Sequence, residues 1–332
     1  MNNNVDKIIR EIDKWYLSGE RFLNIQSLPY TLLDMFIKLF KKEDVKILYI
    51  TNESEKISII EKLESIGFED YIYYIKGSEL KKVNIVNFEI ASALNSDMDF
   101  NVVIYDDLHC YPTYEYEDIS NLILMLVKNS KRAICLSIEC IFNGVTKIIY
   151  PLGRYPYAFV EPLFIQTRVN LREDMCTFAY DFINWSITEQ KKVIIYTPGY
   201  NRMYDVLGYL RDYYKNSDLP ILENHVNRRG INDIIAFNFY KVAIIVTNNF
   251  DDRMFNYENK NIIVLFADSK LLNYRQIIDM CGRVYVKDEF SRSEIVLIGA
   301  TQSTEVEKSL KITRELNRIA WESGFLSMRK MS

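Results

Sequence analysis

The feature that most constrains the fold is a regular alternation of short apolar runs with longer amphipathic stretches along nearly the whole chain. Short runs rich in Ile, Val and Tyr predict buried strands, whereas apolar residues spaced three and four positions apart predict helices. Strands that alternate with helices form parallel sheets covered on both faces. The sequence therefore predicts an α/β protein built from doubly wound parallel sheets.

The alternation occurs twice. A chain of 332 residues is about twice the usual domain length of ~100–200 residues, and an irregular, Pro-containing stretch at 150–161 separates the two series. We therefore predict two tandem domains, 1–155 and 156–332. The first series consists of predicted strands at 22–25, 45–51, 71–75, 83–88, 102–105 and 133–137 and helices at 4–16, 30–41, 54–66 and 119–128. The second consists of strands at 192–197, 221–224, 242–247, 262–267 and 294–298 and helices at 203–213, 274–280 and 305–323, the last closing the chain.

Composition excludes several classes of protein. Apolar residues make up 48% and charged residues 26%, which is a globular balance. No apolar run approaches the ~18 residues of a membrane span, and the first twenty residues are too polar for a signal peptide. The five cysteines are scattered and only two histidines are present, so we expect no zinc site and a reducing, cytoplasmic location.

Charge argues against a protein that holds nucleic acid by charge alone. The first 165 residues carry 18 Lys and Arg against 24 Asp and Glu, and the remainder carries 23 against 21. Neither half has the strongly basic surface of such proteins. Any nucleic-acid binding must therefore be local, weak or shared with a partner.

Two adjacent carboxylates, Asp106 and Asp107, end the apolar run that starts at Val102. A buried strand that carries acids at its carboxyl end is typical of a site for a metal ion and a phosphate. The structural alternative is an acidic pair that caps the next turn or pairs with a nearby cation. In either case a cation or hydrogen-bond donor should lie close by, because neighbouring carboxylates resist simultaneous ionisation.

The segment Phe100–Pro112 resembles the D-E-x-D/H Walker B motif of superfamily 2 (DEAD/DEAH-like) helicases, and its Tyr-Pro ending is similar to the late-competence helicase-like family ComFA. Two further segments resemble helicase motifs in the same order: Val246–Asn256 is similar to T-T-x-x-x-E-R-G, and Arg275–Val284 to Q-x-x-G-R-x-G-R. The resemblance runs from about Phe22 to the closing helix. It implies two RecA-like domains and ATP-dependent handling of single-stranded DNA during competence.

The nucleotide-binding loop departs from this pattern. At its expected place the chain reads Ser27-Leu-Pro-Tyr-Thr31, without glycines to bring backbone N–H groups onto phosphates, and with Tyr30 where lysine belongs. Pro29 removes one N–H donor. These losses remove most of the electrostatic stabilisation on which phosphoryl transfer depends.

The arginine motif departs as well. Asp279 replaces glutamine, and the usual arginine-finger position is the neutral Val286, although Arg283 is retained. The four-cysteine zinc module of many ComFA relatives is absent. Losses at several independent catalytic parts favour a degenerate, ATPase-defective motor.

For a residual Mg-ATP site, weak or lost, the resemblance implies Asp106 and Asp107 as Walker B-like acids, with Asp106 holding Mg²⁺ only together with nucleotide. It implies Thr31 and Arg283 as remaining cofactor contacts. The structural alternative for Arg283 is a domain-interface salt bridge. His109 could couple the nucleotide site to the second domain, or be a satisfied histidine at an interface.

For nucleic acid, the resemblance implies Thr247, Asp252 and Arg253, with a polar loop after a buried strand as the alternative. Three functions stay open from the sequence. The chain is a pseudo-helicase that binds single-stranded DNA and competence or DNA-processing proteins, an active divergent DNA translocase, or an interaction scaffold that binds neither ATP nor DNA.

Overall fold

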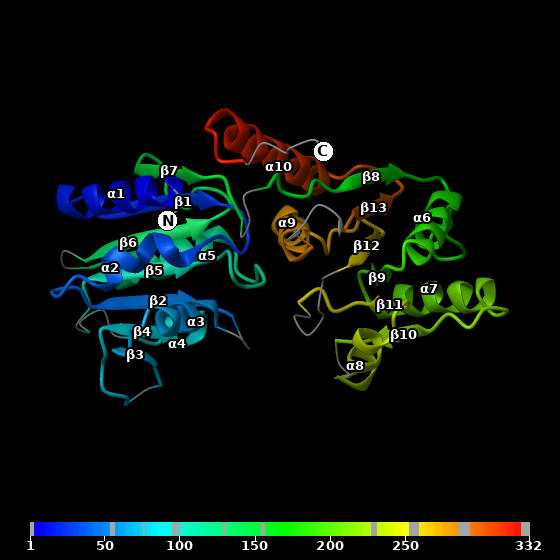
Figure 1. Cartoon of the computed structure of the whole chain (residues 1–332), viewed down its shortest axis with the longest axis horizontal. Coiled ribbons are helices and arrows are strands. Elements are labelled where there is room, and N and C mark those ends of the chain that lie inside the picture. The colour runs from blue at the N-terminus through cyan, green and yellow to red at the C-terminus, as the bar shows by residue number, and fades with distance from the viewer. Residues whose placement is uncertain are drawn as a thin grey trace. The chain divides into compact units, whose positions relative to one another are not determined.

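Figure 1 presents a computed structural model, which describes residues 3–53, 57–75, 77–94, 98, 100–128, 131–153, 157–226, 231–251, 259–284 and 293–326. The chain divides into two compact units. The first comprises Met1–Ala158 together with Leu316–Ser332, and the second comprises Phe159–Glu315. The division passes through the predicted closing helix, α10 (Thr304–Glu322), whereas the sequence prediction assigned that whole helix to the second domain.

The first unit is built on a seven-stranded sheet in which every pairing is parallel, in the order β3-β4-β2-β5-β6-β1-β7. All residues of β2 and β5 are buried, which requires cover on both faces. The strands are β1 (Phe22–Ser27), β2 (Ile47–Thr51), β3 (Tyr71–Tyr73), β4 (Val83–Val86), β5 (Val102–Asp106), β6 (Arg132–Ser137) and β7 (Thr146–Tyr150). The helices are α1 (Asn3–Ser18), the 3-10 helix η1 (Leu33–Phe36), α2 (Ile37–Phe40), α3 (Ser58–Ser65), α4 (Phe88–Ser92) and α5 (Tyr116–Leu126).

The strand order determines which loops meet. β6 lies between β5 and β1, with Asp106 opposite Leu136 and Gln26 opposite Ser137. Because the carboxyl ends of parallel strands share one edge of the sheet, the segments after β1, β5 and β6 lie together. The acid pair and the Ser27–Thr31 segment therefore belong to one site.

The second unit repeats the plan with a six-stranded, fully parallel sheet in the order β10-β11-β9-β12-β13-β8. Its core joins apolar side chains of α6, α7 and the central strands. The strands are β8 (Leu163–Gln166), β9 (Lys192–Tyr196), β10 (Ile221–Asn224), β11 (Ile244–Thr247), β12 (Lys260–Leu265) and β13 (Ile295–Gly299). Besides α10, the helices are α6 (Thr177–Thr188), α7 (Tyr200–Tyr213), α8 (Ile231–Phe239) and α9 (Tyr274–Arg283).

The predicted fold class is confirmed: two tandem doubly wound parallel sheets. The edge strands β7 and β8 and the helices α4, α6 and α8 were not predicted. The helix predicted at 30–41 is wrong in its first three residues, because Tyr30 has a left-handed backbone (φ 58°) and Leu32 is extended. Helical structure starts only at Leu33, and first as a 3-10 turn. Across the described ranges, none of the helices has the length and apolar character needed to cross a membrane.

Candidate functional site

Asp106, the last residue of β5, is 1% exposed and its carboxylate is surrounded by donors from the protein itself. The hydroxyl of Tyr49 on β2 donates to Oδ2, and the backbone N–H groups of Leu108 and His109 donate to Oδ1 at 2.9 and 3.2 Å. His109 also approaches through Nδ1, 2.9 Å from Oδ2. Both oxygens of the Walker B-like acid are therefore already hydrogen-bonded.

His109 is the cation that the acid pair was expected to need. Its Nδ1 faces the Asp106 carboxylate and its Nε2 lies 2.8 Å from the backbone carbonyl of Thr31. Both partners are acceptors, so both ring nitrogens must carry a proton and the ring is an imidazolium. Burial alone would lower the pKa of His109, but the charge of Asp106 and its hydrogen bond outweigh that effect and raise it. Burial alone would likewise raise the pKa of Asp106, and His109 holds it below its ordinary value.

The Ser27–Thr31 segment is closed onto the same residues. The N–H of Tyr30 donates to the carbonyl of Leu108 at 3.0 Å, and the hydroxyl of Ser27 bonds to Thr31 Oγ1 at 2.9 Å and to the carbonyl of Tyr150. The segment leads into a 3-10 turn whose start has no side-chain cap. A phosphate cradle needs free backbone N–H groups ahead of a regular helix. Here the N–H of Tyr30 is already bonded and a 3-10 turn follows, so the segment does not form such a cradle.

These residues do not fit Mg-ATP. Thr31 is 3% exposed with its hydroxyl bonded to Ser27, and Asp107 is buried with its N–H donated to the carbonyl of Leu136 at 2.9 Å. Lys38 could have replaced the missing lysine, but its ammonium binds Asp13 at 3.0 Å. The Asp106 carboxylate and the Thr31 hydroxyl, which would receive the metal, already hold hydrogen bonds within the protein.

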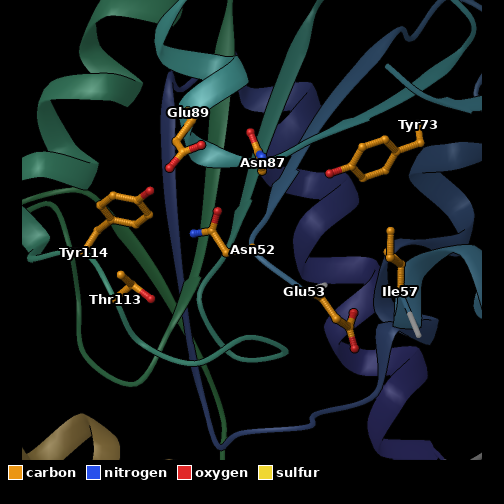
Figure 2. A pocket seen from close by; sticks show the side chains of 8 residues that line it. All are labelled: Asn52, Glu53, Ile57, Tyr73, Asn87, Glu89, Thr113 and Tyr114. Atoms are coloured by element: carbon orange, nitrogen blue, oxygen red, sulfur yellow. The ribbon is translucent and has the colours of Figure 1, made fainter. Parts of the chain in front are cut away.

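A pocket of about 520 Å³ opens at the same edge of the sheet, beyond the ends of β2, β3 and β4 (Figure 2). Glu53 joins it to the closed site, because its charge contributes to the raised pKa of His109. The sequence interpretation did not identify this pocket, although its residues end or follow four adjacent parallel strands, β3, β4, β2 and β5, where binding residues often lie. The lining residues are Asn52, Glu53, Ile57, Tyr73, Asn87, Glu89, Thr113 and Tyr114.

In the second unit, Arg283 pairs with Asp279 one turn earlier on α9. Its Nη2 and Nε lie 2.6 and 3.0 Å from Asp279 Oδ2, and the two side chains are 2% and 3% exposed. The salt bridge is thus internal to one helix. The acid that stands in place of the helicase glutamine is the residue that binds the retained arginine.

Thr247 ends β11 and is fully buried. Its hydroxyl accepts hydrogen bonds from the N–H of Asn249 at 3.0 Å and from Asn224 Nδ2 at 3.4 Å, and its carbonyl accepts one from the N–H of Thr197 at 2.9 Å. The other two nucleic-acid candidates, Asp252 and Arg253, lie outside the described residues.

Two polar groups of the second unit, one on Thr197 after β9 and one on Arg202 of α7, were not identified from the sequence. The hydroxyl of Thr197 and Nη1 of Arg202 are buried and have no hydrogen-bond partner among the residues that the structure describes. Arg202 lies in the first turn of α7, whose N-cap, Gly199, provides no side-chain cap, and its guanidinium is 4.8 Å from the centre of the Phe266 ring. N–H groups at a helix start together with a cation form a site suited to an anion. The strand-Pro-Gly-helix order of Thr197–Tyr200 was the available signal.

No protein-family model and no curated protein matches the chain. Solved structures do match it. The chain is similar to S. tokodaii Xpd4, with a TM-score of 0.59 and 10% identity over 97% of this chain and 98% of that one. It is also similar to the E. coli DExH-box NTPase HrpB (TM-score 0.54, 11% identity, 91% of this chain and 42% of that one) and to the Escherichia coli DEAH/RHA helicase HrpB (0.52, 10%, 92% and 43%).

These likenesses show a helicase-like fold of two RecA-like domains. At 10–11% identity they show the fold alone, and the chain spans less than half the length of the HrpB structures.

Proposed function

We propose that this chain is a helicase-like protein that binds single-stranded nucleic acid without hydrolysing ATP, and acts as a binding or scaffold partner. The observation that carries the proposal is the His109–Asp106 pair. The imidazolium neutralises the carboxylate that would otherwise hold Mg²⁺, and it ties that carboxylate to Thr31.

The loss of hydrolysis follows from what phosphoryl transfer requires. Catalysis rests on a phosphate cradle, a lysine, Mg²⁺ and an arginine placed around the transferred group. Here Tyr30 replaces the lysine, Asp106 is held by Tyr49 and His109, and Arg283 is bound to Asp279. An active translocase would have to break all of these contacts.

Nucleic-acid binding is supported by the second unit. It has the uncapped start of α7, and the hydroxyl of Thr197 and Nη1 of Arg202 have no hydrogen-bond partner within the described part of the chain. A phosphate group of a nucleic-acid backbone would accept hydrogen bonds from all three. The site supplies few charges, so binding should be weak and strongest at low salt.

The resemblance to ComFA extends the proposal to single-stranded DNA handled during competence, in the cytoplasm. In that setting the chain would bind a DNA-processing protein or an intact motor. Phosphate contacts carry no sequence information, so the arrangement at α7 favours no particular sequence.

The test measures ATP and oligonucleotide separately. Calorimetric titration with Mg-ATP should give no saturating heat in the wild type, and phosphate release should stay at background with or without single-stranded DNA. A labelled oligonucleotide should bind at low salt. Replacing Arg202→Gln should weaken that binding about three- to tenfold and reduce the salt slope by about 0.7.

The matched control is Arg211→Gln, which removes one cation from the other end of α7, where Arg211 pairs with Glu223 at 3.2 Å. Its effect should be smaller. DNA-stimulated turnover that Asp106→Asn abolishes would establish an active motor instead. The absence of oligonucleotide binding by folded protein at low salt would leave the interaction scaffold.

A further inference from the structure

The pocket at the ends of β2, β3 and β4 is a second site, distinct from the closed nucleotide site. Its volume of about 520 Å³ falls within the ~300–1,000 Å³ of ligand-binding clefts. Glu53 follows β2, Tyr73 ends β3, and Asn87 and Glu89 follow β4. Figure 2 shows their side chains arranged around one space.

The polar lining is acidic. Glu53 and Glu89 carry its only charges among the described lining residues, which include no Lys, Arg or His. The amide oxygens of Asn52 and Asn87 already accept backbone hydrogen bonds, at 3.0 Å from Phe88 and 2.8 Å from Ile90, so the two carboxylates are left as the acceptors for a cation. The pocket therefore disfavours a phosphate and favours a cation.

Glu53 lacks a cationic partner within this lining. Its carboxylate accepts hydrogen bonds from the N–H of Ser58 at 2.6 Å and from its hydroxyl at 2.7 Å. Burial nevertheless raises the pKa of Glu53, because these donors and the charge of His109 offset its desolvation only in part. A cation bound in the pocket would add a second positive charge beside Glu53, in addition to His109.

Aromatic rings form the rest of the wall. Tyr114 is stacked on Phe88, with ring centroids 3.8 Å apart and planes 15° from parallel, which fixes its orientation. Tyr73 lies on the other side of the pocket in Figure 2. A planar guanidinium stacks on such rings and donates in a fork to carboxylates, whereas an ammonium is a compact point charge.

We propose that this pocket binds a guanidinium group, held by Glu53 and Glu89 and stacked on Tyr114. The group can come from an arginine side chain of a partner protein or from free arginine. This site goes beyond the proposed function, since it needs neither ATP nor nucleic acid. It gives the chain an attachment point for a basic partner.

The experiment titrates the full chain with three probes: a blocked arginine tripeptide, the matching lysine tripeptide and free arginine. We expect the arginine tripeptide to bind in the millimolar range or tighter and the lysine tripeptide about three- to tenfold more weakly. Replacing Glu89→Gln, an exposed position with no role in the core, should weaken arginine binding about three- to tenfold. Glu43→Gln is the matched control, because Glu43 is an exposed acid before the amino end of β2 and should leave binding unchanged.

The probes distinguish a guanidinium of a partner protein from the guanidinium of free arginine. Preference for the tripeptide over free arginine indicates a protein partner, and equal affinity indicates the free molecule. No binding up to about 10 mM, or binding that Glu89→Gln and Glu53→Gln leave unchanged, overturns the proposal. The proposal is also overturned if an oligonucleotide displaces the arginine tripeptide and binds more tightly to the Glu89→Gln variant than to the wild type. The pocket would then be binding phosphate.

Discussion

The carboxyl edges of the two sheets have the same architecture but differ in how their polar groups are hydrogen-bonded. In the first unit, the groups after β1 and β5 satisfy one another: His109 joins Asp106 to Thr31, and Ser27 bonds to Thr31. In the second unit, the hydroxyl of Thr197 and one nitrogen of Arg202 are buried without a partner in the described part of the chain. The same fold thus has one sheet edge whose polar groups pair with one another and one edge with unpartnered polar atoms, because the chemistry lies in the side chains placed on the fold.

Buried charge explains the closed edge. A buried carboxylate without lysine or metal needs an internal cation, because an unpaired charge in the interior is strongly unfavourable. His109 provides that cation in the first unit. In the second unit, the carboxylate of Asp279 neutralises the buried guanidinium of Arg283. Breaking these pairs tests how far the stability of each sheet edge depends on internal charge pairing.

The largest expected effect is on the stability of the first unit. His109→Ala leaves Asp106 buried without its counter-charge, and removal of one partner of a buried pair costs about 3–5 kcal/mol of unfolding free energy. Urea denaturation followed by tryptophan fluorescence would measure it. Lys14→Ala, which breaks the exposed pair with Glu11, should have little effect. A similarly small loss for His109→Ala would mean that the imidazolium does not hold this edge closed.

The same pair predicts a pH dependence. The pKa of His109 is raised on folding, so its contribution is complete below its ordinary value of 6.5 and is lost as pH rises through its folded-state pKa. The pKa of Asp106 is lowered, so its contribution is lost only as pH falls below 3.8. Stability of the first unit should therefore decline from about pH 6.5 upward.

Thermal unfolding between about pH 5 and pH 9 would measure this decline. In His109→Gln the decline should vanish above pH 6.5, while the protein is less stable throughout. The pKa of Glu53 is also raised, from 4.5, and produces a decline of the same sign that begins at lower pH. Glu53→Gln should remove that part and should also make the His109-dependent decline smaller, because the charge of Glu53 contributes to the raised pKa of His109. A pH profile identical in wild type and His109→Gln would contradict the imidazolium assignment.

Features of the two sheet edges that depend on residues close in sequence could be predicted, whereas contacts between residues far apart in sequence could not. Alternating strands and helices are local patterns, so the fold class was predictable, as was the need for a counter-charge near Asp106. The Asp279–Arg283 pair has helical i, i+4 spacing, which favours a salt bridge, but the sequence interpretation did not consider one within the helix. Contacts such as Tyr49 to Asp106 join residues 57 positions apart and depend on strand order, which local pattern does not specify. Thr197 and Arg202 carry only the weak signal of the Pro-Gly turn between β9 and α7, and the acidic pocket carries no motif, so its residues are identified by their placement in the fold.

The smallest expected effect comes from Tyr30, where the closed edge carries backbone strain. A left-handed conformation at φ 58° costs a tyrosine about 1 kcal/mol, and asparagine tolerates it better. Tyr30→Asn should therefore stabilise the protein by up to about 1 kcal/mol in urea denaturation, less whatever the edge contact of Tyr30 with the His109 ring contributes. The control is Tyr240→Asn, since Tyr240 has no positive φ and its replacement should not raise stability.

Because the N–H of residue 30 still donates to Leu108 in the Tyr30→Asn variant, Mg-ATP should remain unbound. ATP binding that appears with this single change would mean that the tyrosine conformation, and not the His109–Asp106 pair, keeps the edge closed.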